Sequence, residues 1–122
     1  MSEPSAVARV AIATHTGVRV SEHFGYATRF EIWEVRPEGS RLVETRINRP
    51  PCGSGSDRAD EMMDASVAAV SDCRAVVVER LGDCALSRLE KLGILAFETD
   101  DPVDATVRQL AAYAGLYGGA KA

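Results

Sequence analysis

The sequence predicts an α/β domain in which a mixed β-sheet lies between two layers of helices. The first part of the chain, up to about residue 48, contains three runs of apolar, aromatic and β-branched residues with strand periodicity. The remainder alternates helical patterns with short apolar runs, which are typical of parallel strands buried between helices. An antiparallel half followed by right-handed crossovers gives a mixed sheet in three layers.

Residues 7–13 (VARVAIA) are apolar and β-branched, and they predict the first strand. Residues 29–36 (RFEIWEVR) predict the second. The neighbouring large residues Ile32 and Trp33 interrupt its alternation, which indicates a central strand that is covered on both faces.

The third predicted strand, residues 41–48, alternates between an apolar and a charged face. We expect Val43, Thr45 and Ile47 on one face and Glu44 and Arg46 on the other. A strand with one charged face is typical of a sheet edge.

From residue 56 the pattern is helical, and helices are expected to begin at about Ser56, Cys84 and Pro102. Ser56 or Asp57 is the expected cap of the first helix and Asp101 that of the last. Short apolar runs at 75–78 and 94–97 predict two strands between the helices. This element order is also that of ribonuclease H-like folds.

Each predicted helix has an apolar stripe, and a glycine follows the second helix. Gly93 is expected to end that helix. The tail, with Gly115, Gly118 and Gly119, is expected to fray. The stripes consist of Met63, Val67 and Val70; of Leu86, Leu89 and Leu92; and of Val103, Val107, Leu110, Ala111 and Ala114.

The composition excludes several classes of protein. The 122 residues suit a single domain, and the net charge of −4, with no basic block, argues against nucleic acid as a partner. No apolar run approaches the roughly 20 residues that span a bilayer, and residues 1–6 do not resemble a signal peptide, so we expect a soluble, cytoplasmic protein without a membrane partner. Three cysteines without a CxxC pair favour reduced thiols over a disulfide framework or a zinc ribbon.

Residues 21–25 (SEHFG) lie between the first two predicted strands, so His23 falls in a connecting loop. The imidazole is a candidate ligand, and Gly25 would let a bulky group approach the backbone beside it. The alternative is a capped or core histidine followed by a turn glycine.

Two of the cysteines are also candidate ligands. Cys52 lies in a loop rich in proline, glycine and serine (PPCGSGSD), and Cys84 follows Gly82 at a predicted helix start, where backbone N–H groups favour a thiolate. That position could instead merely cap a buried helix. Cys73 precedes a buried strand and is expected to be a small core residue.

Several catalytic functions do not fit these residues, so we expect no enzymatic activity. The first strand has no carboxylate for the two metal ions of a ribonuclease H-type nuclease. No lysine follows the 53–55 glycine loop as in a phosphate-binding motif. A Cys52–His23 nucleophilic pair is conceivable, but it has no recognisable oxyanion hole or orienting third residue.

Soft-metal binding fits better, because thiolate and imidazole both bind iron. Permanent iron–sulfur clusters usually have four cysteine ligands, so a smaller set is typical of a carrier that releases its cluster. Backbone N–H groups of residues 53–55 and the guanidinium of Arg46 or Arg49 could offset the charge of a cluster. The alternative for these arginines is a solvated strand face.

The chain resembles the dinitrogenase iron-molybdenum cofactor biosynthesis family over about residues 6–115. This family comprises NifX-type proteins and the C-terminal domain of NifB, and the later half of the chain is most similar to the NifB domain. Its most specific motif is HFG, whose histidine corresponds to His23. The segments that carry the resemblance are 7–13 (VARVAIA), 21–27 (SEHFGYA), 30–32 (FEI), 46–53, 72–77 (DCRAVV), 80–82 (RLG) and 89–94 (LEKLGI).

The resemblance implies a ribonuclease H-like fold without nuclease activity that binds or carries iron–sulfur precursors of the nitrogenase cofactor. Other cofactor assembly proteins would then be the donor and acceptor of the cluster. The chain lacks the radical-SAM cysteine motif, so it is not expected to assemble the cluster. His15 is either an additional ligand or a residue without a role.

These observations lead to one predicted site and one alternative. The expected metal ligands are His23, Cys52 and Cys84. In the alternative, a cluster-free interaction or regulatory module, the His23 loop and the strand at 41–48 recruit a partner protein. The expected cofactor-binding residues are His23, Phe24, Gly25, Arg46, Cys52 and Gly53.

Overall fold

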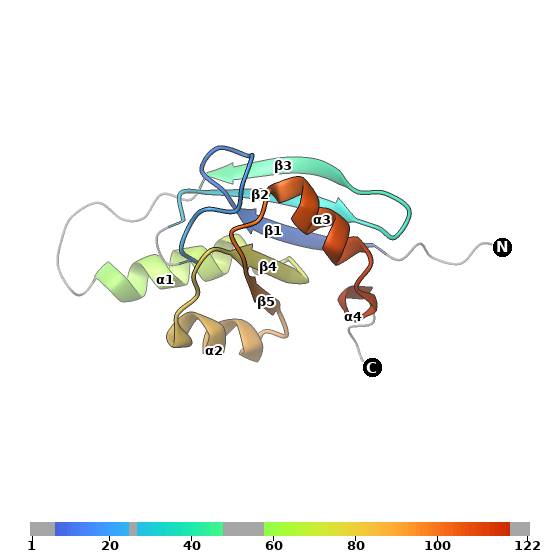
Figure 1. Cartoon of the computed structure of the whole chain (residues 1–122). Helices are drawn as coiled ribbons and strands as arrows, with labels where there is room; N and C mark the ends of the chain where they lie inside the picture. The colour runs from blue at the N-terminus through green and yellow to red at the C-terminus, as the bar shows by residue number, and fades with distance from the viewer. Residues whose placement is uncertain (1–6, 25–26, 48–57, 118–122) are drawn as a thin grey trace.

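The computed structural model describes residues 7–24, 27–47 and 58–117. Within them a mixed sheet has the strand order β3-β2-β1-β4-β5 (Figure 1). β2 is antiparallel to β1 and β3 to β2, whereas β4 is parallel to β1 and β5 to β4. The strands are β1 (Ala8–Ala13), β2 (Arg29–Val35), β3 (Arg41–Ile47), β4 (Ala75–Val78) and β5 (Leu95–Glu98).

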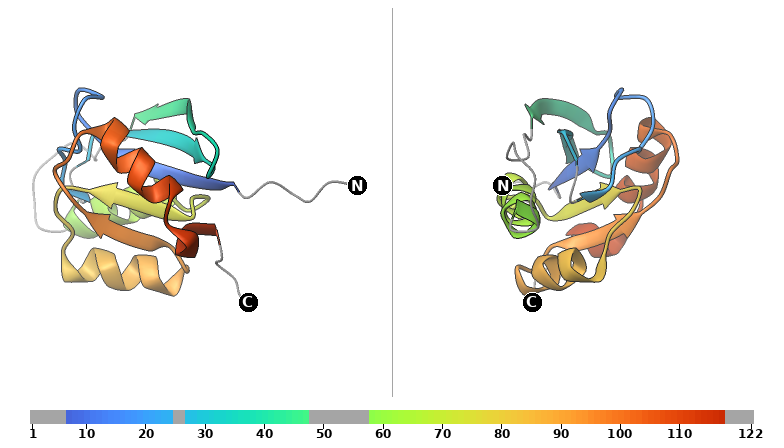
Figure 2. Two further views of the ribbon diagram at one scale, coloured as in Figure 1. Left: turned by 45° about the vertical axis from the view of Figure 1, so that its right-hand side comes forward. Right: turned by 90° about the vertical axis from the view of Figure 1, so that its left-hand side faces the viewer.

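Helices cover both faces of this sheet (Figure 2). α1 (Arg58–Ala69) and α2 (Asp83–Lys91) lie on one face, and α3 (Val103–Ala111) and the short α4 (Ala114–Tyr117) lie on the other. The predicted mixed sheet in three layers is therefore confirmed. Among the described residues, no helix is long and apolar enough to cross a membrane.

Two apolar cores fill the spaces between the layers, because the central strands are apolar on both faces. In β1, Ala11 and Ala13 face the α1–α2 core, whereas Val10 and Ile12 face the α3–α4 core. Phe24, which precedes β2, belongs to the first core. The right-hand view of Figure 2 shows α1 and α2 on one side of the sheet and α3 on the other.

The predicted stripe of α2 is wrong in two of its three positions. Leu86 and Leu92 are 36% and 55% exposed, while Ala85 and Leu89 are buried. Positions four residues apart stay on one face of a helix better than a run of three-residue steps, which drifts around the axis. Gly93 follows the helix with a φ of 75°, as expected.

The start of α3 and the chain that follows α3 also differ from the prediction. Pro102, not Asp101, is the cap, because the Pro102 carbonyl already accepts the N–H of Thr106. Where the tail was expected to fray, residues 114–117 form a helical turn. Arg74 holds this turn by donating hydrogen bonds to the carbonyls of Gly115 and Leu116. The expected caps Ser56 and Asp57, and the tail glycines Gly118 and Gly119, lie outside the described residues.

β3 is an edge strand as expected, and Thr45 and Ile47 lie on the face opposite Glu44 and Arg46, as predicted. Val43 differs from the prediction, because it packs against the α1–α2 core on the face of Arg46. Thr45 and Ile47 are exposed, whereas Arg46 is half-buried on the α1 face, opposite Phe30 of β2. A shift in the β2–β3 register between Ile32 and Trp33 changes which residues face the core.

The ends of four strands meet at one edge of the sheet, which we call the carboxyl edge. The parallel strands β1, β4 and β5 all end there. β3 also ends there, because Ile47 lies opposite Arg29 and Phe30 lies opposite Ala13. Loops that leave this edge come from distant parts of the sequence.

Candidate functional site

His23 lies in a segment that continues the sheet beyond the carboxyl edge. After β1 and the 14–20 loop, the chain comes back to the end of β1, where the N–H of Ser21 donates a hydrogen bond of 3.1 Å to the carbonyl of Ala13. Residues 21–24 then run parallel to the continuation of β4, where His23 forms a β-bridge with Arg80. The backbone therefore fixes the position of His23.

The side chains on either side of His23 are anchored, whereas its imidazole is exposed. The Phe24 ring is buried against Phe30, with 6.1 Å between the ring centroids. The Glu22 carboxylate accepts hydrogen bonds from residues 28 and 29. The loop thus presents one side chain of the three to solvent.

His23 lines a cavity of about 390 Å³ at the carboxyl edge. A hydrogen bond of 2.7 Å from the N–H of Leu81 to a Glu98 carboxylate oxygen ties the loop after β4 to the end of β5. Sequence reasoning missed this side of the site. The order of the predicted strands could have identified it, since residues that follow parallel strands meet at one edge of a sheet. The other residues that line the cavity are Glu79, Arg80, Leu81, Gly82 and Glu98.

The 14–20 loop before His23 is bound to the start of α3. The N–H of Val20 donates to the Asp101 carbonyl at 3.0 Å, and the N–H of Val103 donates to the Val18 carbonyl at 2.9 Å. His15 lies in this loop with a 75% exposed side chain, and its Nδ1 is 3.7 Å from the Glu22 carboxylate. His15 therefore lies near the His23 segment but does not line its cavity.

The two described cysteines differ in exposure. Cys84 is exposed in the first turn of α2, two residues after Gly82 of the cavity. Cys73 is buried, as predicted, and burial together with the neighbouring Asp72 charge raises the pKa of its thiol to about 12. Only Cys84 of these two presents its thiol to solvent.

Arg46 is held in a charge network between β3 and the end of α1. Its guanidinium donates hydrogen bonds to both carboxylate oxygens of Asp72, at 2.7 and 2.9 Å, and to the carbonyl of Ala69. Arg9 also contacts Asp72, at 3.1 Å, and Glu44 contacts Arg46, at 2.7 Å. We call Arg9, Glu44, Arg46 and Asp72 the α1-end network.

The α1-end network stabilises the charged forms of its members. The hydrogen bonds with Asp72 and Glu44 raise the pKa of Arg46, and those with Arg46 hold the pKa of Asp72 well below its usual range. These contacts give Arg46 a structural role, whereas Arg80 is the arginine that lines the His23 cavity.

Three of the predicted site residues, Gly25, Cys52 and Gly53, lie outside the described residues, as does Arg49. The chain leaves β3 at the carboxyl edge and enters α1 at Arg58. Within the described part, no group of three or more His, Cys, Asp or Glu side chains is placed to hold a metal ion. His23 and Cys84 are the predicted ligands that the structure describes.

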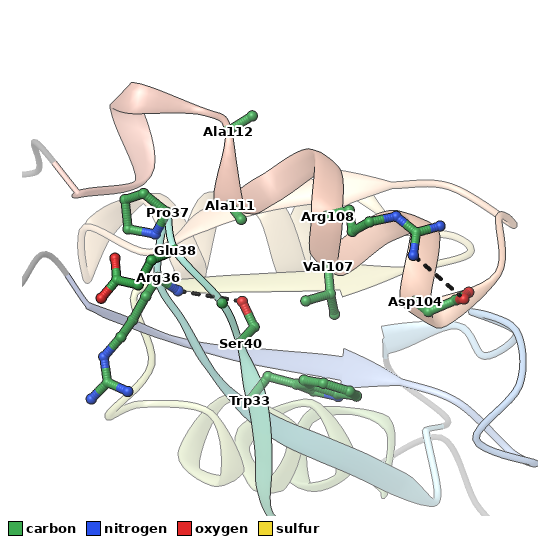
Figure 3. A pocket seen from close by; sticks show the side chains of 11 residues that line it. Trp33, Arg36, Pro37, Glu38, Ser40, Asp104, Val107, Arg108, Ala111 and Ala112 are labelled. Atoms are coloured by element: carbon green, nitrogen blue, oxygen red, sulfur yellow. Dashed lines mark hydrogen bonds and ion pairs between the residues drawn. The ribbon is translucent and has the colours of Figure 1, made fainter.

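A second cavity, of about 460 Å³, lies between the β2–β3 turn and α3 (Figure 3). Trp33, Val107 and Ala111 form its apolar part, and Arg108 pairs with Asp104 at its rim, with 3.8 Å between nitrogen and oxygen. None of the predicted site residues lines this cavity. The β2–β3 turn on one side of this cavity lies at the end of the strands opposite to the carboxyl edge, whereas Asp104 on the other side belongs to the first turn of α3.

Residues 6–113 match the model of the family described as dinitrogenase iron-molybdenum cofactor. The chain belongs to this family. It is 38% identical over 95 residues to FeMo cofactor biosynthesis protein NifB of Herbaspirillum seropedicae, and 35% identical over 111 residues to that of Frankia alni. These matches cover 78% and 89% of the chain, but only 17% and 22% of the relatives. The chain thus spans about a fifth of the length of the curated relatives it matches.

Two solved structures share the fold of this family member. The crystal structure of PH0822 has a TM-score of 0.64 at 21% identity, covering 84% of this chain and 89% of the other. That of a putative dinitrogenase from Methanocaldococcus jannaschii has a TM-score of 0.56 at 13% identity, covering 86% and 88%. At these identities the likeness concerns the fold alone.

Proposed function

We propose that this domain binds an iron–sulfur cluster or a precursor of the iron-molybdenum cofactor and carries it between cytoplasmic proteins of nitrogenase cofactor assembly. It catalyses no reaction itself. Family membership supports the pathway, as do the relatives named FeMo cofactor biosynthesis protein. The order β3-β2-β1-β4-β5 supports a ribonuclease H-like fold.

The observation that carries the proposal is the exposed imidazole of His23, held between two anchored neighbours at the edge of a rigid sheet. A ligand fixed in this way loses little conformational entropy when it binds a metal. In the proposal, His23 is the first ligand of the cluster.

Cys84 and Cys52 are the proposed thiolate ligands. Cys84 lies at the start of α2, next to the loop that lines the His23 cavity. The chain segment that contains Cys52 connects the carboxyl-edge end of β3 to α1. A cluster held by at most three protein ligands keeps a site open for exchange, which suits transfer to an acceptor.

A second candidate function is a cluster-free interaction module. The edge strand β3 favours it, because Leu42 and Ile47 are 45% and 63% exposed there. In that case the domain would recruit an assembly protein through β3 and the His23 loop. It would acquire no iron during reconstitution.

Anaerobic reconstitution with ferrous iron and sulfide tests the proposal. The wild type should gain iron, sulfide and visible absorbance, and His23→Ala should lose most of all three while keeping its fold. His15→Ala tests whether the other histidine is an additional ligand, because His15 is exposed near the same loop but does not line the cavity. Wild-type iron content in this variant would leave His15 without a role in binding. A colourless wild type would support the interaction module, and wild-type iron content in His23→Ala would contradict the ligand assignment.

Cys52→Ser and Cys84→Ser, measured in the same way, test the thiolate ligands. Each should lower iron content, because each removes one proposed ligand. Wild-type iron content in both variants would leave His23 without a thiolate partner and would contradict the three-ligand site.

A further inference from the structure

Glu22 directly precedes His23 in the chain. Its carboxylate connects the start of the His23 loop to residues 28 and 29 at the end of that loop. It accepts hydrogen bonds from the N–H of Thr28 at 2.8 Å, from the Thr28 hydroxyl at 2.9 Å and from the N–H of Arg29 at 3.3 Å. Its side chain is only 13% exposed. Charge-assisted hydrogen bonds of this kind are stronger than neutral ones and resist competition from water when they are shielded.

The backbone on both sides of His23 is tied to other strands. The Glu22 carbonyl accepts the N–H of Glu79 at 2.9 Å, and the N–H of Phe24 donates to the Arg80 carbonyl at 3.0 Å. Main-chain bonds thus attach the segment to the continuation of β4. The Glu22 side chain attaches it to the start of β2 and so closes the loop.

We infer that Glu22 is a positioning residue for His23. By closing the loop, its carboxylate holds the imidazole in a single orientation at the carboxyl edge. This inference rests on the proposed function, because it takes His23 to be a ligand. Residues that orient a metal ligand from the second layer contribute about 10–100-fold to metal affinity, so the expected effect is measurable.

The experiment measures how tightly the iron–sulfur cluster reconstituted from ferrous iron and sulfide is held, as the concentration of a ferrous chelator that removes half of the iron. Glu22→Ala should lower that concentration by about tenfold or more. Glu22→Gln keeps an oxygen that accepts the bonds from Thr28 and Arg29, and it should recover most of the loss. Glu34→Ala is the matched control, since Glu34 is a carboxylate of β2 that pairs with Arg36 and Arg41.

Pulsed electron paramagnetic resonance of the reduced cluster separates positioning from a general loss of stability. The wild type should show nitrogen coupling from imidazole, His23→Ala should not, and Glu22→Ala should show an altered coupling. A variant that is merely less stable would melt at a lower temperature with the wild-type coupling.

The outcomes distinguish the inference from the proposed function. Wild-type coupling and iron content in His23→Ala would show that His23 is not a ligand, and Glu22 would then have no ligand to position. A loss in His23→Ala with wild-type retention and coupling in Glu22→Ala would overturn the positioning role alone. If Glu22→Ala does not fold, Glu22→Asp keeps the charge but shortens the side chain, so that the carboxylate no longer reaches both Thr28 and Arg29. Wild-type retention and coupling in that variant would overturn the inference.

Discussion

The carboxyl edge has an arginine and a cysteine, Arg80 and Cys84, and so does the α1-end network together with the adjoining Cys73, yet the two regions differ in burial and in charge pairing. At the carboxyl edge, Arg80 and Cys84 are exposed, and no ion pair joins Arg80 to any other residue that the structure describes. At the end of α1, Arg46 is bound by Asp72, and Cys73 is buried.

This difference shows that contacts, rather than residue type, separate a structural side chain from one available to a ligand. The backbone fixes both regions equally well, through hydrogen bonds between strands or at a helix end. Of the two regions, only the carboxyl edge has an arginine side chain, that of Arg80, without an ion pair to another residue that the structure describes. Substitutions should therefore affect stability at the α1-end network and ligand binding at the carboxyl edge.

Thiol labelling should give the largest difference between the regions. Cys84 should react with iodoacetamide at least about 100 times faster than Cys73, because Cys73 must first be exposed by opening of the core. Peptide mapping after timed labelling of the apo-protein measures the two rates. Urea should abolish the difference, whereas similar rates in the native protein would mean that the α1 end opens readily.

Serine substitutions of Cys73 and Cys84 should differ in how much they lower the free energy of unfolding. Cys73→Ser places a hydroxyl at the border of the apolar core, beside the Asp72 carboxylate, and should lower the free energy of unfolding by about 1–3 kcal/mol. Cys84→Ser should change it by less than about 0.5 kcal/mol, because its side chain is exposed. Urea unfolding of the apo-proteins checks both values, and equal costs would contradict the comparison.

Glutamine substitutions of Arg46 and Arg80 should also differ in their effect on the free energy of unfolding, but by less than the cysteine substitutions do. Arg46→Gln removes hydrogen bonds to Asp72, Glu44 and the Ala69 carbonyl, and it should cost about 1–2 kcal/mol. Arg80→Gln should cost less than about 0.5 kcal/mol. Chemical unfolding in low salt is the measurement. A larger loss for Arg80→Gln would show that Arg80, too, has a structural role.

Much of this fold was predictable because its signals are local. The apolar run at 75–78 identified a buried strand, and the alternation at 41–48 identified an edge strand, without knowledge of any partner. The stripe of α2 was not predicted correctly, since Leu86, Leu89 and Leu92 are equally apolar and only packing decides which of them is buried.

The site was predictable only where one residue is distinctive. His23 stands out because it is one of two histidines in the chain and lies in a loop. Arg80 and Glu98 do not stand out, because their place beside His23 follows from the pairing of distant strands. The pairing of Arg46 with Asp72 is equally non-local, so the sequence does not show that the guanidinium is bound at the end of α1.

The smallest expected effect is the dependence of stability on pH through Asp72. Hydrogen bonds with Arg46 hold the pKa of Asp72 below its value in the unfolded chain, which is about 3.9. The folded protein therefore releases this proton more readily than the unfolded chain, and the resulting stabilisation is fully present above about pH 4. It is lost as the pH falls from there through the lowered pKa of the folded state.

Wild type and Asp72→Asn should therefore differ by a constant free energy of unfolding between about pH 5 and pH 7, and the difference should shrink below about pH 4. Because the Asp72 side chain is 47% exposed, solvent screening limits the difference to about 1 kcal/mol. Urea unfolding across this pH range measures it, and added salt should reduce it because the network is near the surface. A difference that grows toward acid would mean that Asp72 is destabilised as an anion, and the α1-end network would then need another explanation.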